Sequence, residues 1–270
     1  MKRGRIKMCK ELNGQRRYKV RINFAIIKQK IRYVQNKIED IIYPRRCPVC
    51  DEVLRFGRGK ICAKCYHQLS YIHEPRCKKC GRSIRKFEQE YCYDCSRKKH
   101  FFISGIALID NVEAGKKSVY AIKYHNKREY VDFYTDEIVK RYSDEIRYWQ
   151  PDILIPVPLH KKKMIKRGYN QAEVIAVSIG MKMGIKVDKK SLKRIVNTKP
   201  QKELNDIERR RNLANAFCVN INQKNVKGKS IILIDDIYTT GSTIDECAKV
   251  LLKAGAKKVH FITLSIGIGY

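Results

Sequence analysis

The sequence predicts an α/β protein, a parallel sheet flanked by helices, preceded by a small module that is held together by metal. After residue 100, short apolar runs alternate with segments of helical periodicity, which is typical of a parallel sheet covered on both faces. Before residue 100, eight of the eleven cysteines form four C-x-x-C pairs. The apolar content of 43% is ordinary for a chain that buries a core.

The sheet and its helices are expected between residues 102 and 266. We predict strands over 102–109, 152–158, 230–236 and 257–266, and helices over 118–148, 171–184 and 242–256. Ligands of parallel sheets bind outside the carboxyl ends of the strands. Asp235, Asp236 and the segment after Pro158 lie at such ends, so they are the first candidates for a binding site.

The N-terminal part divides into two segments. Residues 1–23 are basic and poorly patterned, and we expect a disordered extension or a start placed too early. Residues 24–43 are expected to form an amphipathic helix that ends before Pro44. Its apolar side chains recur at helical spacing and are Ile27, Ile31, Val34, Ile38 and Ile41. The stripe would pack on a neighbouring domain or, as a less favoured alternative, lie on a membrane. Residues 44–100 then form the metal-held module and residues 101–270 the α/β domain.

Positive charge is dense at the start of the chain. The formal net charge is +32, and residues 1–46 hold 15 Lys and Arg against 3 Asp and Glu. This balance favours contact with a polyanion such as nucleic acid, or with an anionic membrane surface. The alternative is an AT-rich genome that favours Lys codons, with an ordinary solvated surface. The sequence has no apolar run of membrane-spanning or signal-peptide type, so we expect a cytoplasmic protein without a transmembrane segment.

The cysteine pairs predict two structural zinc sites. Two residues between cysteines let a tight turn aim both sulfurs at one ion, and two turns complete a four-sulfur site. We favour sequential pairing, although a cross-braced arrangement of the first pair with the third is an alternative. The predicted ligands are Cys47, Cys50, Cys62 and Cys65 for one ion, and Cys77, Cys80, Cys92 and Cys95 for the other.

Zinc in this module is expected to act mainly as a staple. About fifty residues bury too little core to fold alone, so metal binding supplies folding free energy. A full set of four sulfurs leaves no open position, so catalytic zinc is not expected. A binding role would belong to surrounding side chains, namely Arg55, Arg58, Lys60, Arg82, Arg85 and Lys86.

The stretch IILIDDIYTTGST, residues 231–243, predicts a phosphate site beside two acids. A strand that turns at once into a helix leaves backbone N–H groups free to bind an anion, and Gly241 allows close approach. Further donors are the hydroxyls of Thr239, Thr240, Ser242 and Thr243. Asp235 and Asp236 would repel a phosphate and are better suited to a sugar diol. The alternative is an ordinary buried strand with two surface acids.

This stretch resembles the phosphoribosyl pyrophosphate (PRPP) loop of type I phosphoribosyltransferases. Residues 156–172 resemble the matching segment of the ComF family (ComFC/GntX-like), whose RG[FY]NQ pattern stands here at 167–171, and the four C-x-x-C pairs also match that family. The resemblance implies a type I phosphoribosyltransferase fold after a double zinc ribbon. It also implies that Asp235 and Asp236 hold the ribose hydroxyls, while residues 239–243 surround the 5-phosphate.

Two further segments would complete the site. A basic segment beside the strand end would stabilise leaving pyrophosphate, unless it is merely solvated surface; its residues are Lys161, Lys162, Lys163 and Arg167. Residues 192–217 fit the family's pattern and suit a lid, or hood, over the substrate, with a plain basic surface as the alternative. The hood residues carried over from the resemblance are Arg194, Thr198, Gln201 and Arg210.

The sequence leaves two functional hypotheses open. One is a Mg²⁺-dependent phosphoribosyltransferase that displaces pyrophosphate from PRPP, with an acceptor that the residues do not identify. His160 is the one candidate base, although a structural role suits it better. The other is a non-catalytic competence factor that binds single-stranded DNA, with a PRPP-sensing or relic pocket and a helicase-type partner in the competence machinery. Candidate stacking platforms are Tyr66, Phe87, Tyr91 and Tyr93.

Overall fold

The computed structural model describes residues 44–55, 59–197, 213, 215–220 and 226–268. The described residues from Arg45 onward belong to one compact unit. The predicted extension at 1–23 and the predicted helix at 24–43 lie outside the described residues. The division between a metal-held module and an α/β domain at residue 100 stays a prediction, because residues 45–270 form one unit. No helix among the described residues is long and apolar enough to span a membrane.

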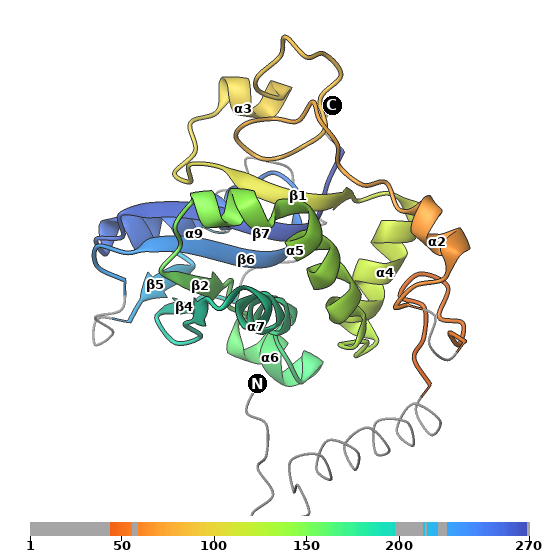
Figure 1. Cartoon of the computed structure of the whole chain (residues 1–270). Helices are drawn as coiled ribbons and strands as arrows, with labels where there is room; N and C mark the ends of the chain where they lie inside the picture. Colours follow the sequence, from red (N-terminus) through yellow and green to blue (C-terminus); the bar gives the residue numbers. More distant parts are fainter. Residues whose placement is uncertain (1–43, 56–58, 198–212, 214, 221–225, 269–270) are drawn as a thin grey trace, which may run out of the picture. The chain divides into compact units, whose positions relative to one another are not determined.

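The centre of the larger unit is a five-stranded sheet in the order β1-β7-β6-β2-β3 (Figure 1). Every neighbouring pair in it is parallel, as predicted. The strands are β1 (Gly105–Asp110), β2 (Ile153–Pro156), β3 (Lys186–Val187), β6 (Ser230–Tyr238) and β7 (Lys258–Ile266). The four longer strands match the predicted ones, while β3 is too short and polar to be read from the sequence.

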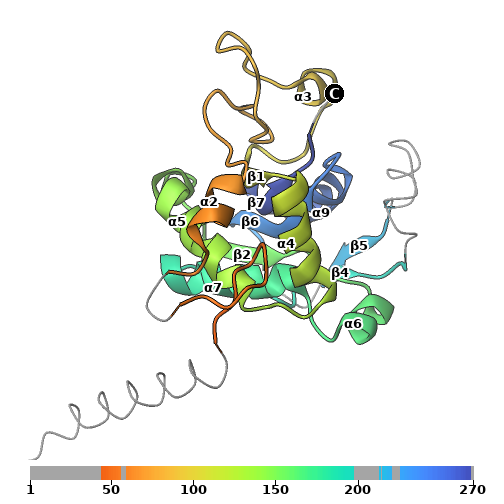
Figure 2. The ribbon, with the colours of Figure 1, turned by 90° about the vertical axis from the view of Figure 1, so that its right-hand side faces the viewer.

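Helices cover both faces of the sheet because the strands are apolar on both sides. In β6, Ile232 and Ile234 pack in one core with α4 (Glu113–Tyr124), α5 (Tyr130–Tyr148) and α7 (Gln171–Met183). Ile231 and Leu233 pack in a second core with α9 (Ser242–Lys253). Successive side chains of a strand point to opposite faces, so an unbroken apolar run supplies both cores. Figure 2 shows the helices around the sheet from its side.

Three local features differ from the predictions. The helix expected over 118–148 is two helices, α4 and α5, separated by a turn in which Asn126 has a φ of 56°. The basic segment after β2, for which no helix was predicted, forms the short helix α6 (Lys161–Arg167), which ends at Gly168 with a φ of 76°. The ends of the predicted hood pair as two antiparallel strands, β4 (Leu192–Arg194) and β5 (Phe217–Val219).

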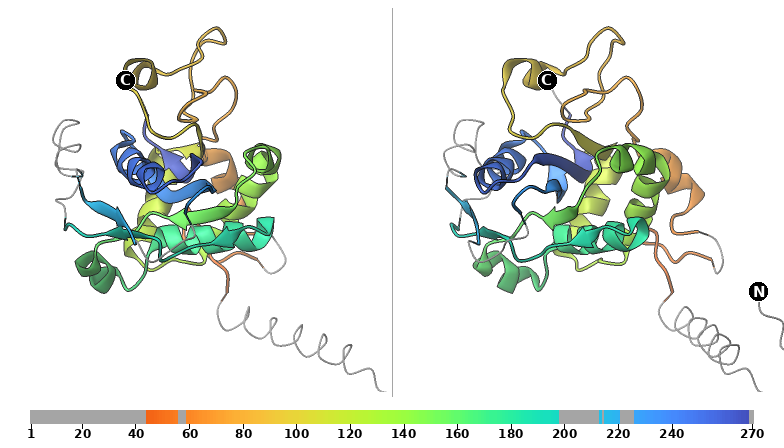
Figure 3. Two further views of the ribbon diagram at one scale, coloured as in Figure 1. Left: turned by 90° about the vertical axis from the view of Figure 1, so that its left-hand side faces the viewer. Right: turned by 60° about the vertical axis from the view of Figure 1, so that its left-hand side comes forward.

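The cysteine-rich part consists of two ribbons that repeat one backbone pattern thirty residues apart. In the first, the N–H of Cys47 donates to the carbonyl of Glu52 over 2.8 Å, and α2 (Ala63–Gln68) follows Cys62. In the second, Cys77 and Arg82 make the same bond at 2.8 Å, and α3 (Tyr93–Arg97) follows Cys92. The first ribbon joins the core of α4 and α5, and the second joins the core of α9. Figure 3 shows the loops of the second ribbon projecting beyond the sheet.

Candidate functional site

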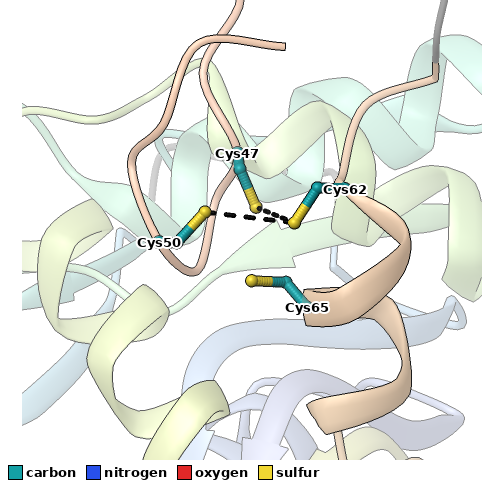
Figure 4. A group of neighbouring side chains, drawn as sticks. All are labelled: Cys47, Cys50, Cys62 and Cys65. Carbon is teal, nitrogen blue, oxygen red and sulfur yellow. Dashed lines mark hydrogen bonds between the residues drawn. The ribbon is translucent and has the colours of Figure 1, made fainter.

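The cysteines converge in two clusters whose geometry fits zinc. The sulfurs within each cluster all lie within 4.8 Å of one another. Cys47 Sγ lies 3.7 Å from Cys62 Sγ, and Cys80 Sγ lies 3.6 Å from Cys92 Sγ (Figure 4 shows the first cluster). Sulfurs bound about 2.3 Å from a tetrahedral zinc are separated by about 3.8 Å. The pairing is sequential, and the cross-braced alternative does not fit because the first and third pairs lie in different clusters.

The two clusters are also part of the hydrophobic packing. Cys47 and Cys80 are fully buried, and their neighbours belong to the two cores of the sheet. Each cluster presents four sulfurs, which leaves a bound zinc no open position for a substrate. These sites therefore suit metal as a structural link between the ribbons and the sheet.

The two acids of β6 occupy different environments. Asp236 shares the sheet face of Ile232 and Ile234 and contacts α4 and α7 there, whereas Asp235 points to the face of α9. Burial raises the pKa of the Cys247 thiol on that helix, and the negative charge of Asp235 raises it further. One hydrogen bond joins the two acids: the side-chain Oδ1 of Asp235 accepts the backbone N–H of Asp236 over 2.8 Å. The pair thus offers one carboxylate to each side of the strand end.

Asp236 is held by groups from two helices. Its side chain is 3% exposed, and Lys123 Nζ of α4 lies 2.7 Å from its Oδ2. Gln171 at the start of α7 donates to the same oxygen over 3.2 Å, and Arg167 donates in turn to Gln171 Oε1 over 2.9 Å. The Arg167 guanidinium lies over the ring of Tyr124, 4.9 Å from its centroid. This network fixes Asp236 and Arg167 relative to each other.

Within the described part of the chain, no side chain holds Asp235 in the way that Lys123 and Gln171 hold Asp236. Burial, followed by the charge of Asp236, raises the pKa of Asp235 to about 8, and the charge of Lys123 offsets this only in part. The residue keeps partial exposure to solvent at the end of β6. A carboxyl group whose charge is costly in the free protein is typical of a binding site that a ligand completes.

The segment Thr239 to Thr243, here called the phosphate loop after its predicted role, connects the end of β6 with the start of α9. Gly241 is the N-cap of α9 and has a φ of 80°. A Cβ at this position would lie 2.3 Å from the Tyr238 hydroxyl, so only glycine fits. Gly241 has no side chain that could cap α9, and the first N–H groups of a helix have no acceptor within the helix itself. Thr240 Oγ1 and Ser242 Oγ lie 3.0 Å apart at the same place.

Positive side chains from three elements gather beside the acids. Burial and the charges of Arg194, Arg167 and Lys123 lower the pKa of Lys163, which places Lys163 within electrostatic range of these three cations. Among the predicted basic residues, Lys161 and Lys162 are exposed and belong to the outer surface of α6. His160 caps α6, since its Nδ1 accepts the N–H of Lys162 over 3.3 Å, which supports the structural role for this histidine. Such a cation cluster suits a polyanionic group.

The hood is described only at its ends. Arg194 of β4 lies with its guanidinium 5.2 Å from the centroid of the Phe217 ring of β5. Thr198, Gln201 and Arg210 lie outside the described residues, so their roles stay predictions.

Nothing in the sequence indicated that Lys123 belongs to the site, because a lysine next to a buried Ile122 looks like any surface lysine of an amphipathic helix.

Comparisons with known proteins identify two domains. Residues 38–96 match the double zinc ribbon domain, and residues 166–265 match the phosphoribosyl transferase domain. A purine phosphoribosyltransferase from Pyrococcus horikoshii Ot3 is also similar, with 19% identity over 49% of this chain and 73% of that chain. Its TM-score is 0.30, which is too low to support a conclusion.

Relatives of this chain carry names that refer to competence and to DNA utilization. Competence protein F of Haemophilus influenzae is 34% identical over 110 residues, which is 41% of this chain and 48% of that protein. DNA utilization protein YhgH of Escherichia coli K12 is 34% identical over 41% of this chain and 47% of that protein. Competence protein ComFC of Bacillus subtilis is 28% identical over 55% and 58%. The chain thus spans about half the length of these curated relatives. The chain thus combines a region that matches the double zinc ribbon domain with a region that matches the phosphoribosyl transferase domain in a parallel α/β fold, and it is similar to competence and DNA utilization proteins.

Proposed function

We propose that the chain binds PRPP with Mg²⁺ at the carboxyl ends of β2 and β6 and transfers its phosphoribosyl group with loss of pyrophosphate. The observation that carries this proposal is the meeting of three complementary parts. The start of α9 behind a glycine N-cap suits a phosphate, the cations around Lys163 suit pyrophosphate, and the acids of β6 suit a sugar between them. The names of the relatives support a role for this activity in DNA uptake.

Each part has a defined task in this proposal. The phosphate loop binds the 5-phosphate through backbone N–H groups and threonine hydroxyls. Asp235 accepts hydrogen bonds from the ribose hydroxyls, while Lys123 and Gln171 hold Asp236 beside it. Lys163, Arg167 and Arg194 stabilise charge on the departing pyrophosphate. Carboxylates and phosphate oxygens are the hard ligands that Mg²⁺ prefers, so the site fits this ion, which supplies further positive charge at the pyrophosphate.

Calorimetry of the full chain with PRPP and Mg²⁺ tests the proposal. We expect saturable binding that weakens when Mg²⁺ is omitted, because the cations of the protein then face the pyrophosphate alone. Ribose 5-phosphate should bind more weakly than PRPP, since it lacks the pyrophosphate. Absence of heat from PRPP at millimolar concentration, with the protein folded and loaded with zinc, would overturn the proposed function.

A second candidate function is binding of single-stranded DNA by the second ribbon. Three of its aromatic side chains are exposed, with fractions of 79% for Phe87, 42% for Tyr91 and 52% for Tyr93. The Arg97 guanidinium lies over the Tyr93 ring, 4.2 Å from its centroid. Tyr91 lines a shallow pocket of about 520 Å³, together with the lysines Lys79, Lys98 and Lys99. Aromatic rings among cations suit stacked bases and a phosphate backbone.

The structure also removes residues from the predicted DNA surface. Tyr66 is not a free platform, because its hydroxyl donates to Glu137 and accepts from Arg141 of α5. Lys60 pairs with Asp132 and Asp136 of the same helix. Arg82 is buried. A helicase-type partner stays a prediction from the family resemblance.

A Tyr91→Ala/Tyr93→Ala variant should bind an oligo-dT strand about tenfold more weakly than wild type, because each stacked base contributes about 1–3 kcal/mol. Tyr148→Ala is the matched control, since Tyr148 is 85% exposed on α5, outside the ribbon. Fluorescence anisotropy at several salt concentrations measures both affinity and its salt dependence. Equal losses in the two variants, or wild-type protein that ignores DNA at low salt, would exclude the second ribbon as the DNA surface.

A further inference from the structure

Arg82 belongs to the second zinc ribbon, yet its side chain reaches the phosphate loop. The residue is 6% exposed. One guanidinium nitrogen donates to Asp94 Oδ2 over 2.8 Å, which fixes the side chain within its own ribbon. The other terminal nitrogen donates to the backbone carbonyl of Thr239 over 3.0 Å. A buried arginine thus connects the ribbon with the first residue of the loop.

This contact sets the direction of a loop amide. The C=O of Thr239 and the N–H of Thr240 belong to one planar trans peptide, in which they point in opposite directions. Because Arg82 holds the carbonyl toward the ribbon, the N–H of Thr240 points away from the ribbon. A loop that wraps a phosphate needs its N–H groups directed toward the anion and its carbonyls away from it. Arg82 imposes this arrangement on one peptide of the loop.

The second ribbon has a further contact at the other end of the loop. Asp245 lies in the first turn of α9, where a carboxylate would compete with a bound phosphate. Its Oδ2 lies 2.5 Å from His100 Nδ1, and its Oδ1 accepts the N–H of Phe101 over 3.0 Å. His100 in turn lies with its Nε2 3.7 Å from Cys95 Sγ, a residue of the second sulfur cluster. His100 and Phe101, which directly follow the second ribbon, therefore hold this carboxylate by hydrogen bonds.

We propose that the second zinc ribbon is part of the PRPP site, with Arg82 as a positioning residue that orients the phosphate loop. The ligand in this inference rests on the proposed function, whereas the hold of Arg82 on the loop can be measured without any ligand. The inference gives the ribbon a task in phosphate binding besides its own folding. It also predicts that disturbance of the second sulfur cluster weakens phosphate binding, while the first cluster has no such contact among the described residues.

The test compares Arg82→Met and Arg82→Lys with Arg76→Met. Arg76 is a matched control, because it also connects the second ribbon with the sheet domain, through Glu145 of α5, but does not contact the loop. Three quantities are measured for each protein: zinc per chain, hydrogen exchange of residues 238–244 without ligand, and affinity for PRPP with Mg²⁺. Arg82→Lys keeps the positive charge beside the sulfur cluster but cannot donate to Asp94 and Thr239 from one rigid plane.

We expect Arg82→Met to keep two zinc ions, to exchange faster at residues 238–244 and to bind PRPP about tenfold more weakly, with Arg82→Lys between it and wild type. Arg76→Met should lower Tm and leave exchange and affinity unchanged. The inference would be overturned if residues 238–244 of Arg82→Met exchanged hydrogen as slowly as in wild type. It would also be overturned if Arg76→Met lost as much affinity for PRPP as Arg82→Met does. Wild-type protein without PRPP affinity would overturn the proposed function instead, and the exchange comparison would still decide whether Arg82 holds the loop.

Discussion

Asp235→Asn should weaken the binding of PRPP by about a hundredfold and at the same time raise the stability of the protein. The carboxylate is expected to accept charge-assisted hydrogen bonds from the ribose hydroxyls, and loss of these bonds corresponds to roughly 2–3 kcal/mol. In the free protein, burial and Asp236 raise the pKa of Asp235 to about 8. Its charge therefore costs folding free energy, and an uncharged asparagine removes this cost.

The pH dependence follows from the same shift. An unfolded chain ionises Asp235 near pH 4, whereas the folded chain ionises it only near pH 8. Wild-type stability should thus fall as pH rises from about 4 to 8, because over this range the unfolded state binds fewer protons. Asp235→Asn lacks this loss, and at pH 8 we expect a gain on the order of 2 kcal/mol, or several degrees in Tm. Wild-type affinity for PRPP should rise over the same range as the carboxylate forms.

Asp144→Asn is the matched control for Asp235→Asn. Its side chain is 98% exposed on α5, so this change removes the same charge from the chain without touching the site. Calorimetry with PRPP and thermal unfolding between pH 5 and 8.5 measure both effects. If Asp235→Asn binds PRPP as tightly as wild type, this carboxylate does not bind the ribose hydroxyls. A fall in its Tm would instead show that the charge of Asp235 supports the fold.

Removal of zinc should have the largest effect on stability. Structural zinc contributes an apparent free energy of about 10–16 kcal/mol in small zinc modules, which matches or exceeds the total stability of about 5–15 kcal/mol of an ordinary domain. The sulfur clusters pack into the two cores of the sheet, so metal-free ribbons would expose apolar surface of α5 and α9 as well. We expect a chelator to abolish the cooperative thermal transition of the native protein.

Single cysteine substitutions separate the two sites. Elemental analysis should find two zinc ions per chain in wild type and one in Cys50→Ser or Cys95→Ser, each of which takes a half-buried sulfur from one cluster. Cys218→Ser is the control, because Cys218 is half-buried on β5 and belongs to neither cluster. Two zinc ions in Cys50→Ser, or a transition that survives chelation, would contradict the structural role of the metal.

Local patterns in the sequence were sufficient for the sheet and for both metal sites. Runs such as Ile231 to Ile234 are apolar at every position, which only a strand buried on both faces requires. Four C-x-x-C pairs specify sulfur clusters because the turn between paired cysteines is local. The phosphate loop is likewise recognisable, since the need for Gly241 arises within five residues. The boundaries of α4, α6 and β3 were missed, because short or polar elements carry little periodicity.

What the tertiary structure decided is which distant side chains surround the phosphate loop. Lys123 and Asp236 are more than a hundred residues apart, and their ion pair depends on the packing of α4 against the sheet. Arg82 and Thr239 are 157 residues apart, and their hydrogen bond depends on how the second ribbon docks beside β6. Charge and burial at such positions have no local signature. The sequence by itself therefore determined the main strands and helices and the two cysteine clusters, because each is encoded within a short segment. The electrostatic environment of the acids and the support of the loop by the ribbon required the folded chain.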